Sequence, residues 1–126
     1  MQHVVVVAFD SSFLIAVVDR PTTWYEDIQE KIGRFKPVML DVVEEELAGL
    51  SKKGGKRGRY AALARELGAS FLTAKGGHGG STDDEILSWA ASNKAVVATV
   101  DGRMLEHLRA ARMRFVTLRN GRVYIY

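Results

Sequence analysis

Two aspartates directly follow apolar runs of the sequence. Asp10 comes after the β-branched run at residues 4–9, and Asp101 comes after a similar run at residues 95–100. Such runs are typical of strands that are buried on both faces of a parallel sheet. Open α/β sheets build their sites beyond the carboxyl ends of their strands, so each aspartate is a candidate site residue. A helix N-cap, which aspartate also favours, is the alternative for each of them.

Helical phase selects a third carboxylate, Glu46. A helix advances by about 100° per residue, and the apolar residues of the segment that starts at Val42 share one arc of its surface. Glu46 falls inside this arc, whereas Glu44 and Glu45 fall outside it, as solvated acids do. A carboxylate on the core-facing side of a helix is costly unless something positive compensates it. A structural ion pair or an inexact phase is the alternative to a site role.

The same argument selects Asp83 in a second acidic triplet. Asp83 lies within the arc of the apolar residues that follow it, Asp84 lies at the edge of that arc, and Glu85 lies opposite. Asp83 also stands in the first turn of the predicted helix, where the helix dipole favours an acid, and this effect is the structural alternative. We therefore expect Asp83, rather than its two acidic neighbours, to point towards the site.

Four carboxylates can converge on one pocket above the sheet, namely Asp10, Glu46, Asp83 and Asp101. A site made only of carboxylate oxygens suits Mg²⁺ or Mn²⁺. The sequence has no Cys, and its histidines are too scattered to form a zinc motif: His3, His78 and His107. Ser11 or Ser12 can support the site with a hydroxyl, although a role at a helix start fits them equally well.

Strands and helices alternate along the chain. Five short apolar runs are predicted as strands, at residues 4–9, 36–40, 69–74, 95–100 and 115–118. Helix starts are marked by capping-box spacings, which are Thr23 with Glu26, Asp41 with Glu44 and Thr82 with Glu85. This alternation predicts a doubly wound α/β fold, a three-layer α/β/α sandwich with a mostly parallel twisted sheet. Asn120-Gly121 predicts a short C-terminal hairpin that pairs residues 122–126 with residues 115–118.

Charge is segregated along a chain whose formal net charge is +3. One basic cluster contains no acid and consists of Lys52, Lys53, Lys56, Arg57 and Arg59. A second basic stretch spans residues 103–122. Basic rims around an acidic centre suit the cutting of a phosphodiester, because the rims attract the backbone while the centre captures metal. A soluble surface with randomly placed charge blocks is the alternative.

Length and composition favour one domain over residues 1–126, with 47% hydrophobic residues to build its core. The absence of Cys excludes disulfides and fits a reducing compartment, so we expect a cytoplasmic protein. Asp10 interrupts the apolar N-terminal run and no Lys or Arg precedes it, so a signal peptide is not expected. No stretch reaches the roughly 18 apolar residues that a membrane span needs.

Four motifs resemble those of the PIN-domain nucleases, in order and over essentially the whole chain. Asp10-Ser11-Ser12 resembles the first motif, and residues 43–47 resemble the second, with Glu46 in the acidic place. Residues 83–86 resemble the third motif, and Thr99-Val100-Asp101 resembles the fourth, although Val100 stands where a polar residue is frequent. The basic segment 51–59 is more similar to the archaeal and eukaryotic branch related to ribosomal-RNA processing than to the VapC-type toxins.

The resemblance implies a metal-dependent ribonuclease, an endonuclease by preference, that uses Mg²⁺ or Mn²⁺. It implies that Asp10, Glu46, Asp83 and Asp101 hold or organise the metal, that Asp84 assists through water, and that Ser11, Ser12 and Thr99 support them. It further implies that RNA is bound by Lys52, Lys53, Lys56, Arg57 and Arg59. A homodimer is implied as well, with an antitoxin or a ribosome-assembly factor as a further partner.

Other functions fit parts of the pattern. The same fold can act as an RNA or protein scaffold with little or no catalysis, or as a VapC-type toxin. A phospho-acceptor signalling domain also places acids at strand ends, but here Lys75 is the only candidate for its later lysine and Glu46 would have no role. A P-loop is excluded because no lysine stands directly before Ser81 or Thr82, where that motif requires one.

Overall fold

The computed structural model describes residues 4–77 and 79–126, so His3 and His78 lie outside the described residues. Its centre is one six-stranded sheet. No helix within the described ranges is long and apolar enough to cross a membrane. The elements follow in the order β1 (Val5–Phe9), α1 (Ser11–Asp19), α2 (Trp24–Ile32), β2 (Phe35–Leu40), α3 (Asp41–Lys52), α4 (Gly55–Gly68), β3 (Leu72–Ala74), α5 (Thr82–Asn93), β4 (Val96–Ala98), α6 (Gly102–Ala110), β5 (Phe115–Arg119) and β6 (Arg122–Ile125).

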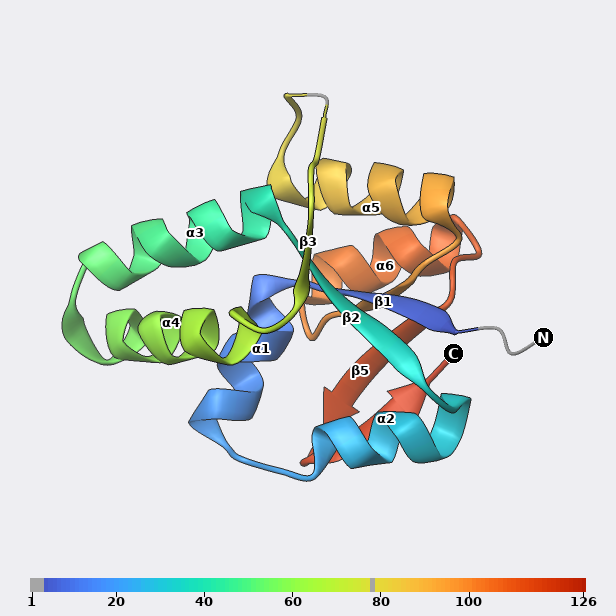
Figure 1. Cartoon of the computed structure of the whole chain (residues 1–126), viewed down its shortest axis with the longest axis horizontal. Coiled ribbons are helices and arrows are strands. Elements are labelled where there is room, and N and C mark those ends of the chain that lie inside the picture. Colours follow the sequence, from blue (N-terminus) through green and yellow to red (C-terminus); the bar gives the residue numbers. More distant parts are fainter. Residues whose placement is uncertain (1–3, 78) are drawn as a thin grey trace.

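The sheet is mostly parallel and is covered on both faces. Its strand order is β3-β2-β1-β4-β5-β6, and only the pairing of β6 with β5 is antiparallel. Because crossovers are right-handed, the connections from β1 to β3 place their helices on one face and those from β3 to β5 on the other. Figure 1 shows α5 and α6 together on one side of the sheet, away from α1, α2 and α4. The predicted three-layer α/β fold is confirmed.

The direction of strand addition reverses beside β1. The chain moves outward from β1 through β2 to β3 and then returns at β4, on the other side of β1. Phe9 is in register with Ala98, and the Asp10 N–H donates to the Ala98 carbonyl at 2.9 Å. The carboxyl ends of β1 and β4 therefore lie side by side, at the position where open α/β sheets form their clefts.

The five predicted strands and the hairpin are confirmed. β3 begins only at Leu72, because the chain after α4 first passes through a turn at residues 69–70. Asn120 and Gly121 both have positive φ, of 53° and 76°. Two successive positive φ angles define the hairpin turn whose twist matches that of the flanking strands.

The predicted helices are present, but the capping boxes are not formed as expected. The Thr23 hydroxyl turns to the Asp27 carboxylate at 3.1 Å instead of capping α2. Asp41 is already the first residue of α3. Ser81, rather than Thr82, caps α5 by accepting a hydrogen bond from the Asp84 N–H at 3.1 Å. Residue spacing alone does not fix which hydroxyl or carboxylate reaches the helix end, because other groups compete for it.

An aromatic cluster supports the end of β1. The Phe9 ring centroid lies 5.4 Å from that of Phe13, 5.5 Å from that of Trp24 and 5.2 Å from that of Phe71. Phe9 and Phe13 are almost completely buried, and Trp24 is a core residue. Edge and tilted contacts of this kind add to the burial energy of the rings. The last residue before Asp10 is therefore fixed by packing from several elements.

Replacing Phe9 is expected to destabilise the fold strongly. Phe9→Ala should lower the free energy of unfolding by about 3–5 kcal/mol, because a large buried ring leaves a cavity. Leu63→Ala is the control, since Leu63 is 47% exposed; it should cost less than about 1 kcal/mol. Urea unfolding followed by circular dichroism measures both values, and equal losses would contradict this description of the core.

Candidate active site

Asp10 is a buried carboxylate at the end of β1. Its Oδ2 accepts hydrogen bonds from the Thr99 hydroxyl at 2.7 Å and the Ser12 hydroxyl at 2.8 Å. Burial is the main cause that raises the pKa of Asp10 above its usual value, and the nearby Glu46 and Asp101 raise it further. The two hydrogen bonds act in the opposite direction. Asp10 precedes α1 but makes no capping bond to it, so the N-cap alternative does not explain its side chain.

Hydroxyl groups join the ends of β1 and β4. The Ser12 and Thr99 hydroxyl oxygens lie 3.1 Å apart, and the Ser12 oxygen also accepts from the Val100 N–H at 3.1 Å. The Thr99 oxygen accepts from the Asp101 N–H at 3.1 Å. Thr99 is fully buried. This network fixes the Asp10 carboxylate relative to the backbone that carries Asp101.

Asp101 combines the two interpretations that the sequence left open. Its Oδ1 accepts from the Met104 N–H at 3.0 Å, so it caps α6. Its charge also contributes to the raised pKa values of Asp10 and Asp83, which places it beside them. One carboxylate has two oxygens, so the cap uses one of them and does not exclude a second role for Asp101.

Glu46 reaches the cluster by a different route from the one expected. Its side chain is exposed rather than turned to the core, so the inward phase predicted for it is wrong. Its Oε1 nevertheless accepts a hydrogen bond from the Ser11 hydroxyl. Its charge raises the pKa values of Asp10 and Asp83. Glu46 therefore stands at the solvent side of the cluster and is attached to the start of α1.

One expectation from helical phase agrees with the structure and another is wrong. Glu44 is at the surface as expected, where its carboxylate pairs with Arg65 of α4 at 2.6 Å. Glu85 was expected opposite the core side, but it is only 7% exposed. Its carboxyl group packs so closely on Gly76 that a Cβ added there would lie 3.2 Å from it. The loop at residues 75–77 covers a surface that a single helix cannot predict.

Asp83 is half-buried at the start of α5. Burial is the main cause that raises its pKa, followed by the charges of Asp10, Asp101 and Glu46. His107 acts in the opposite direction and so lies on the same side of α6 as the cluster. The charges of the other three carboxylates expected at the site thus all act on Asp83.

Asp41 was expected only as a helix cap, but it holds the loop after β3. Its Oδ1 accepts from the Val42 N–H at 2.8 Å and from the Gly76 N–H at 2.9 Å. Asp41 thereby connects the loop at residues 75–77 to the end of β2. The rule that selected Asp10 was the available signal, since Asp41 also follows directly on a predicted strand.

The remaining candidates lie on exposed surface. Asp84 is exposed, and its side chain lies beside Gly80. In the part of the chain that the structure describes, no polar contact joins Asp84 to the four carboxylates. The basic cluster lies around the turn between α3 and α4 and is fully exposed: Lys52, Lys53, Lys56, Arg57 and Arg59. The Lys56 ammonium lies 5.7 Å from the centre of the Tyr60 ring. These side chains are accessible to a ligand from solvent.

A family model described as a PIN like domain matches residues 7–121. The chain belongs to the PIN-like domain family. The comparison with curated proteins found no match. The match includes all four carboxylates. It also covers every element from β1 to β5, apart from the first two residues of β1.

Two solved structures show the same fold as this PIN-like domain. The PIN domain endonuclease Utp24 superposes with a TM-score of 0.77 at 20% sequence identity, over 95% of this chain and 90% of that one. VapBC-1 from nontypeable Haemophilus influenzae superposes with a TM-score of 0.61 at 14% identity, over 87% of this chain and 96% of that one. Family and fold together support a function of the ribonuclease type in general.

The donor atoms of this PIN-like domain fit a hard divalent cation. Carboxylate and hydroxyl oxygens meet at one end of the sheet, and they are the ligands that Mg²⁺ and Mn²⁺ prefer. Within residues 4–77 and 79–126, no three His, Asp or Glu side chains already form a ready set of ligands.

Neutralising Asp83 is expected to stabilise the protein in the presence of EDTA. A carboxyl group with a raised folded-state pKa contributes stability below the pKa of unfolded aspartate and loses it as the pH rises through the folded value. At neutral pH the charge on Asp83 therefore destabilises the fold, and Asp83→Asn should raise the melting temperature by a few degrees.

Asp84→Asn is the matched control on the same turn of α5. Asp84 is exposed, so its neutralisation should leave the melting temperature unchanged or lower it slightly through loss of a favourable dipole interaction. Thermal unfolding in EDTA at pH 7 measures both variants. An unchanged or lower melting temperature for Asp83→Asn would show that the carboxylates do not repel one another as described.

Proposed function

We propose that this chain is a Mg²⁺- or Mn²⁺-dependent ribonuclease that cuts RNA internally, with residues 1–126 as one nuclease domain. The observation that carries the proposal is the buried Asp10 carboxylate, held by the Thr99 and Ser12 hydroxyls among three further acids. A buried carboxylate close to like charges is costly for a fold, and such groups concentrate at functional sites.

Each acidic residue is assigned a part in holding the cation. Asp10 is the fixed ligand, because hydroxyl groups and burial hold it in place. Asp83, Asp101 and Glu46 complete the set as ligands or as groups that orient its water molecules. Asp84 is assigned an assisting role through water. Ser11 positions Glu46, and Ser12 and Thr99 position Asp10.

A divalent ion held by Asp10 with Asp83, Asp101 and Glu46 would supply the activation of a water and the charge neutralisation that in-line attack on phosphorus needs. The chain supplies the negative charge that binds the ion and the rigid strand ends that fix where it binds. The basic cluster at the α3–α4 turn binds the RNA backbone through its exposed cations, namely Lys52, Lys53, Lys56, Arg57 and Arg59. RNA is thus held by its phosphates beside an acidic centre that would otherwise repel it.

The branch related to ribosomal-RNA processing is the preferred place for this chain within the family. The higher TM-score against the Utp24 domain than against VapBC-1 supports this preference over a VapC-type toxin. A ribosome-assembly factor is then a better candidate partner than an antitoxin. We further propose that the protein acts in the cytoplasm and as a homodimer.

Cleavage of a labelled structured RNA tests the nuclease assignment. Wild type should cut the RNA with Mn²⁺ or Mg²⁺ and not with EDTA, leaving 5′-phosphate ends. Asp10→Asn should reduce the rate by at least about 100-fold, since ligand loss costs more than loss of a supporting residue. Asp19→Asn, at the exposed end of α1, is the control and should cut normally.

RNA binding measured in parallel distinguishes a nuclease from a scaffold. If folded wild type binds the RNA and leaves it intact with every metal ion, and Asp10→Asn binds equally well, the chain is a binding scaffold. Cleavage by Asp10→Asn at the wild-type rate would instead remove the carboxylate cluster from the mechanism.

Removing cations at the α3–α4 turn is expected to weaken RNA binding and leave the chemical step intact. The triple change of Lys52, Lys56 and Arg59 to alanine should raise KM with little change in kcat. The salt dependence of binding, log K against log salt, should become shallower by about 2, since each contact to single-stranded phosphate contributes roughly 0.7.

Three exposed cations at a distance from the α3–α4 turn provide a charge-matched control. Arg20, Lys31 and Arg34 are exposed and lie at the ends of α1 and α2, away from the α3–α4 turn. Changing these three residues to alanine should leave the salt slope close to that of wild type. Equal changes of slope in the two triple variants would show that the α3–α4 turn is not the RNA contact.

Light scattering tests the proposed homodimer. At the protein concentration of the cleavage assay, the measured mass should be twice the 13.9 kDa of one chain. A mass equal to one chain at that concentration would exclude the dimer as the active form.

A further inference from the structure

A groove lies at the open edge of the sheet, between α3, α4 and β3. Its volume is about 640 Å³. β3 is the last strand on this side and pairs only with β2. One edge of β3 therefore carries backbone groups that no other strand of the sheet pairs. Its Leu72 side chain is 55% exposed. Edge strands of this kind are where an additional strand from another chain can pair.

The floor of the groove is mostly apolar. Met39 and Thr73 are register partners of parallel strands and line the groove together. Gly68 of α4 approaches Met39 so closely that an added Cβ would lie 3.0 Å from its sulfur atom. Ala62 and Ala69 complete this surface. Small side chains beside a flexible methionine form a surface on which the aliphatic stem of a lysine or arginine can lie.

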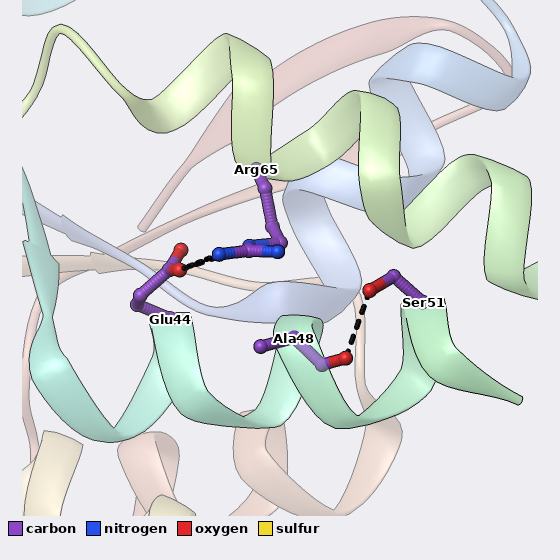
Figure 2. A network of polar contacts seen from close by, with 4 residues as sticks. All are labelled: Glu44, Ala48, Ser51 and Arg65. Carbon is purple, nitrogen blue, oxygen red and sulfur yellow. Dashed lines mark hydrogen bonds and ion pairs between the residues drawn. The ribbon is translucent and has the colours of Figure 1, made fainter.

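The walls of the groove are acidic. Four acids line it against one basic residue, Arg65, which leaves three net negative charges: Asp41, Glu44, Glu45 and Glu66. Arg65 donates from Nε at 2.9 Å and from Nη2 at 2.6 Å to the same Glu44 oxygen (Figure 2). Arg65 is thus already engaged, whereas the exposed Glu45 and Glu66 face the groove with no cation of this chain paired to them in the described ion pairs.

The negative charge of the groove is opposite to the charge at the other end of α3 and α4. The α3–α4 turn at the other end of the two helices carries the exposed basic cluster of residues 52–59. The whole chain has a formal net charge of +3, so the acidic groove is a local exception. An RNA backbone is repelled by the groove and attracted by the turn, which separates the surface suited to nucleic acid from a surface suited to a cationic ligand.

We infer that the groove binds an extended, lysine- or arginine-bearing segment of a partner protein, which pairs with β3 as an added strand. Because β3 has only three residues, backbone bonds alone supply few contacts, and cationic side chains opposite Glu45 and Glu66 provide the rest. Because side chains of a strand alternate between its two faces, the aliphatic stems of these cationic side chains lie on the floor beside Met39, and the apolar side chains between them lie on the other face of the sheet, beside Leu72. The inference does not rest on the nuclease assignment, since it uses none of the four clustered carboxylates.

Peptide binding tests the inference directly. The probe is a capped seven-residue peptide that alternates lysine and valine and carries a fluorophore, with a glutamate-for-lysine peptide as comparison. Fluorescence anisotropy with the full chain should show saturable binding of the lysine peptide alone. The double variant Glu45→Lys/Glu66→Lys should bind it at least about 10-fold more weakly. The control Asp19→Lys/Glu30→Lys, at exposed acids of α1 and α2, should bind as wild type does.

A version of the lysine peptide in which every backbone amide nitrogen is methylated separates strand pairing from simple charge attraction. It keeps the side chains and lacks the backbone donors, so it should bind at least about 10-fold more weakly to wild type. Equal binding of the two peptides would overturn the added strand. Equal weakening in both double variants, or absence of saturable binding to wild type, would overturn the groove as the site.

Two further outcomes identify a different occupant. If wild type is a dimer by light scattering and Glu45→Lys/Glu66→Lys alone is a monomer, a second copy of this chain occupies the groove. A single-stranded RNA can also be tested as a competitor of the peptide. If it displaces the peptide at concentrations near its own dissociation constant, and still does so in the alanine variant of the α3–α4 turn, RNA is the ligand of the groove. Either result contradicts a cationic protein segment.

Discussion

The burial of the Asp10 carboxylate among three further acids at one end of the sheet is the constraint on which the rest of this structure depends. Asp10 is buried, and Asp83, Asp101 and Glu46 are near enough to act on it or on one another. Such a group of like charges opposes folding, so the structure has to hold it with compensating contacts. The Thr99 and Ser12 hydroxyls provide these contacts, and the aromatic cluster around Phe9 fixes the strand end that carries Asp10.

The doubly wound topology explains why the four acids meet although they are far apart in sequence. The reversal of strand order beside β1 places the ends of β1 and β4 next to each other, and the helices that follow neighbouring strands begin at the same edge. Each acid therefore comes from a different element. The α3–α4 pair, which carries Glu46, extends this arrangement outward, with a basic turn at one end and an acidic groove beside β3.

Much of the fold and part of the candidate site could be predicted from the sequence, for identifiable reasons. The strands and the Asn120-Gly121 hairpin followed from local patterns, since buried strands and positive-φ turns restrict residue type directly. Asp10 and Asp101 followed from their place after strands. Helical phase was less reliable, because the loop at residues 75–77 covers Glu85, and Glu46 reaches Ser11 from solvent. Such tertiary coverage is not encoded in the residues of one helix.

A crystal soaked in Mn²⁺ and measured at the manganese absorption edge tests the central claim most directly. The account predicts an anomalous peak among the carboxylates at the ends of β1 and β4, with Asp10 as a ligand. It also predicts that this peak is lost in crystals of Asp10→Asn that keep the same fold. Strong manganese peaks elsewhere on the chain, with none beside Asp10, would contradict the account of this acidic cluster as a metal site.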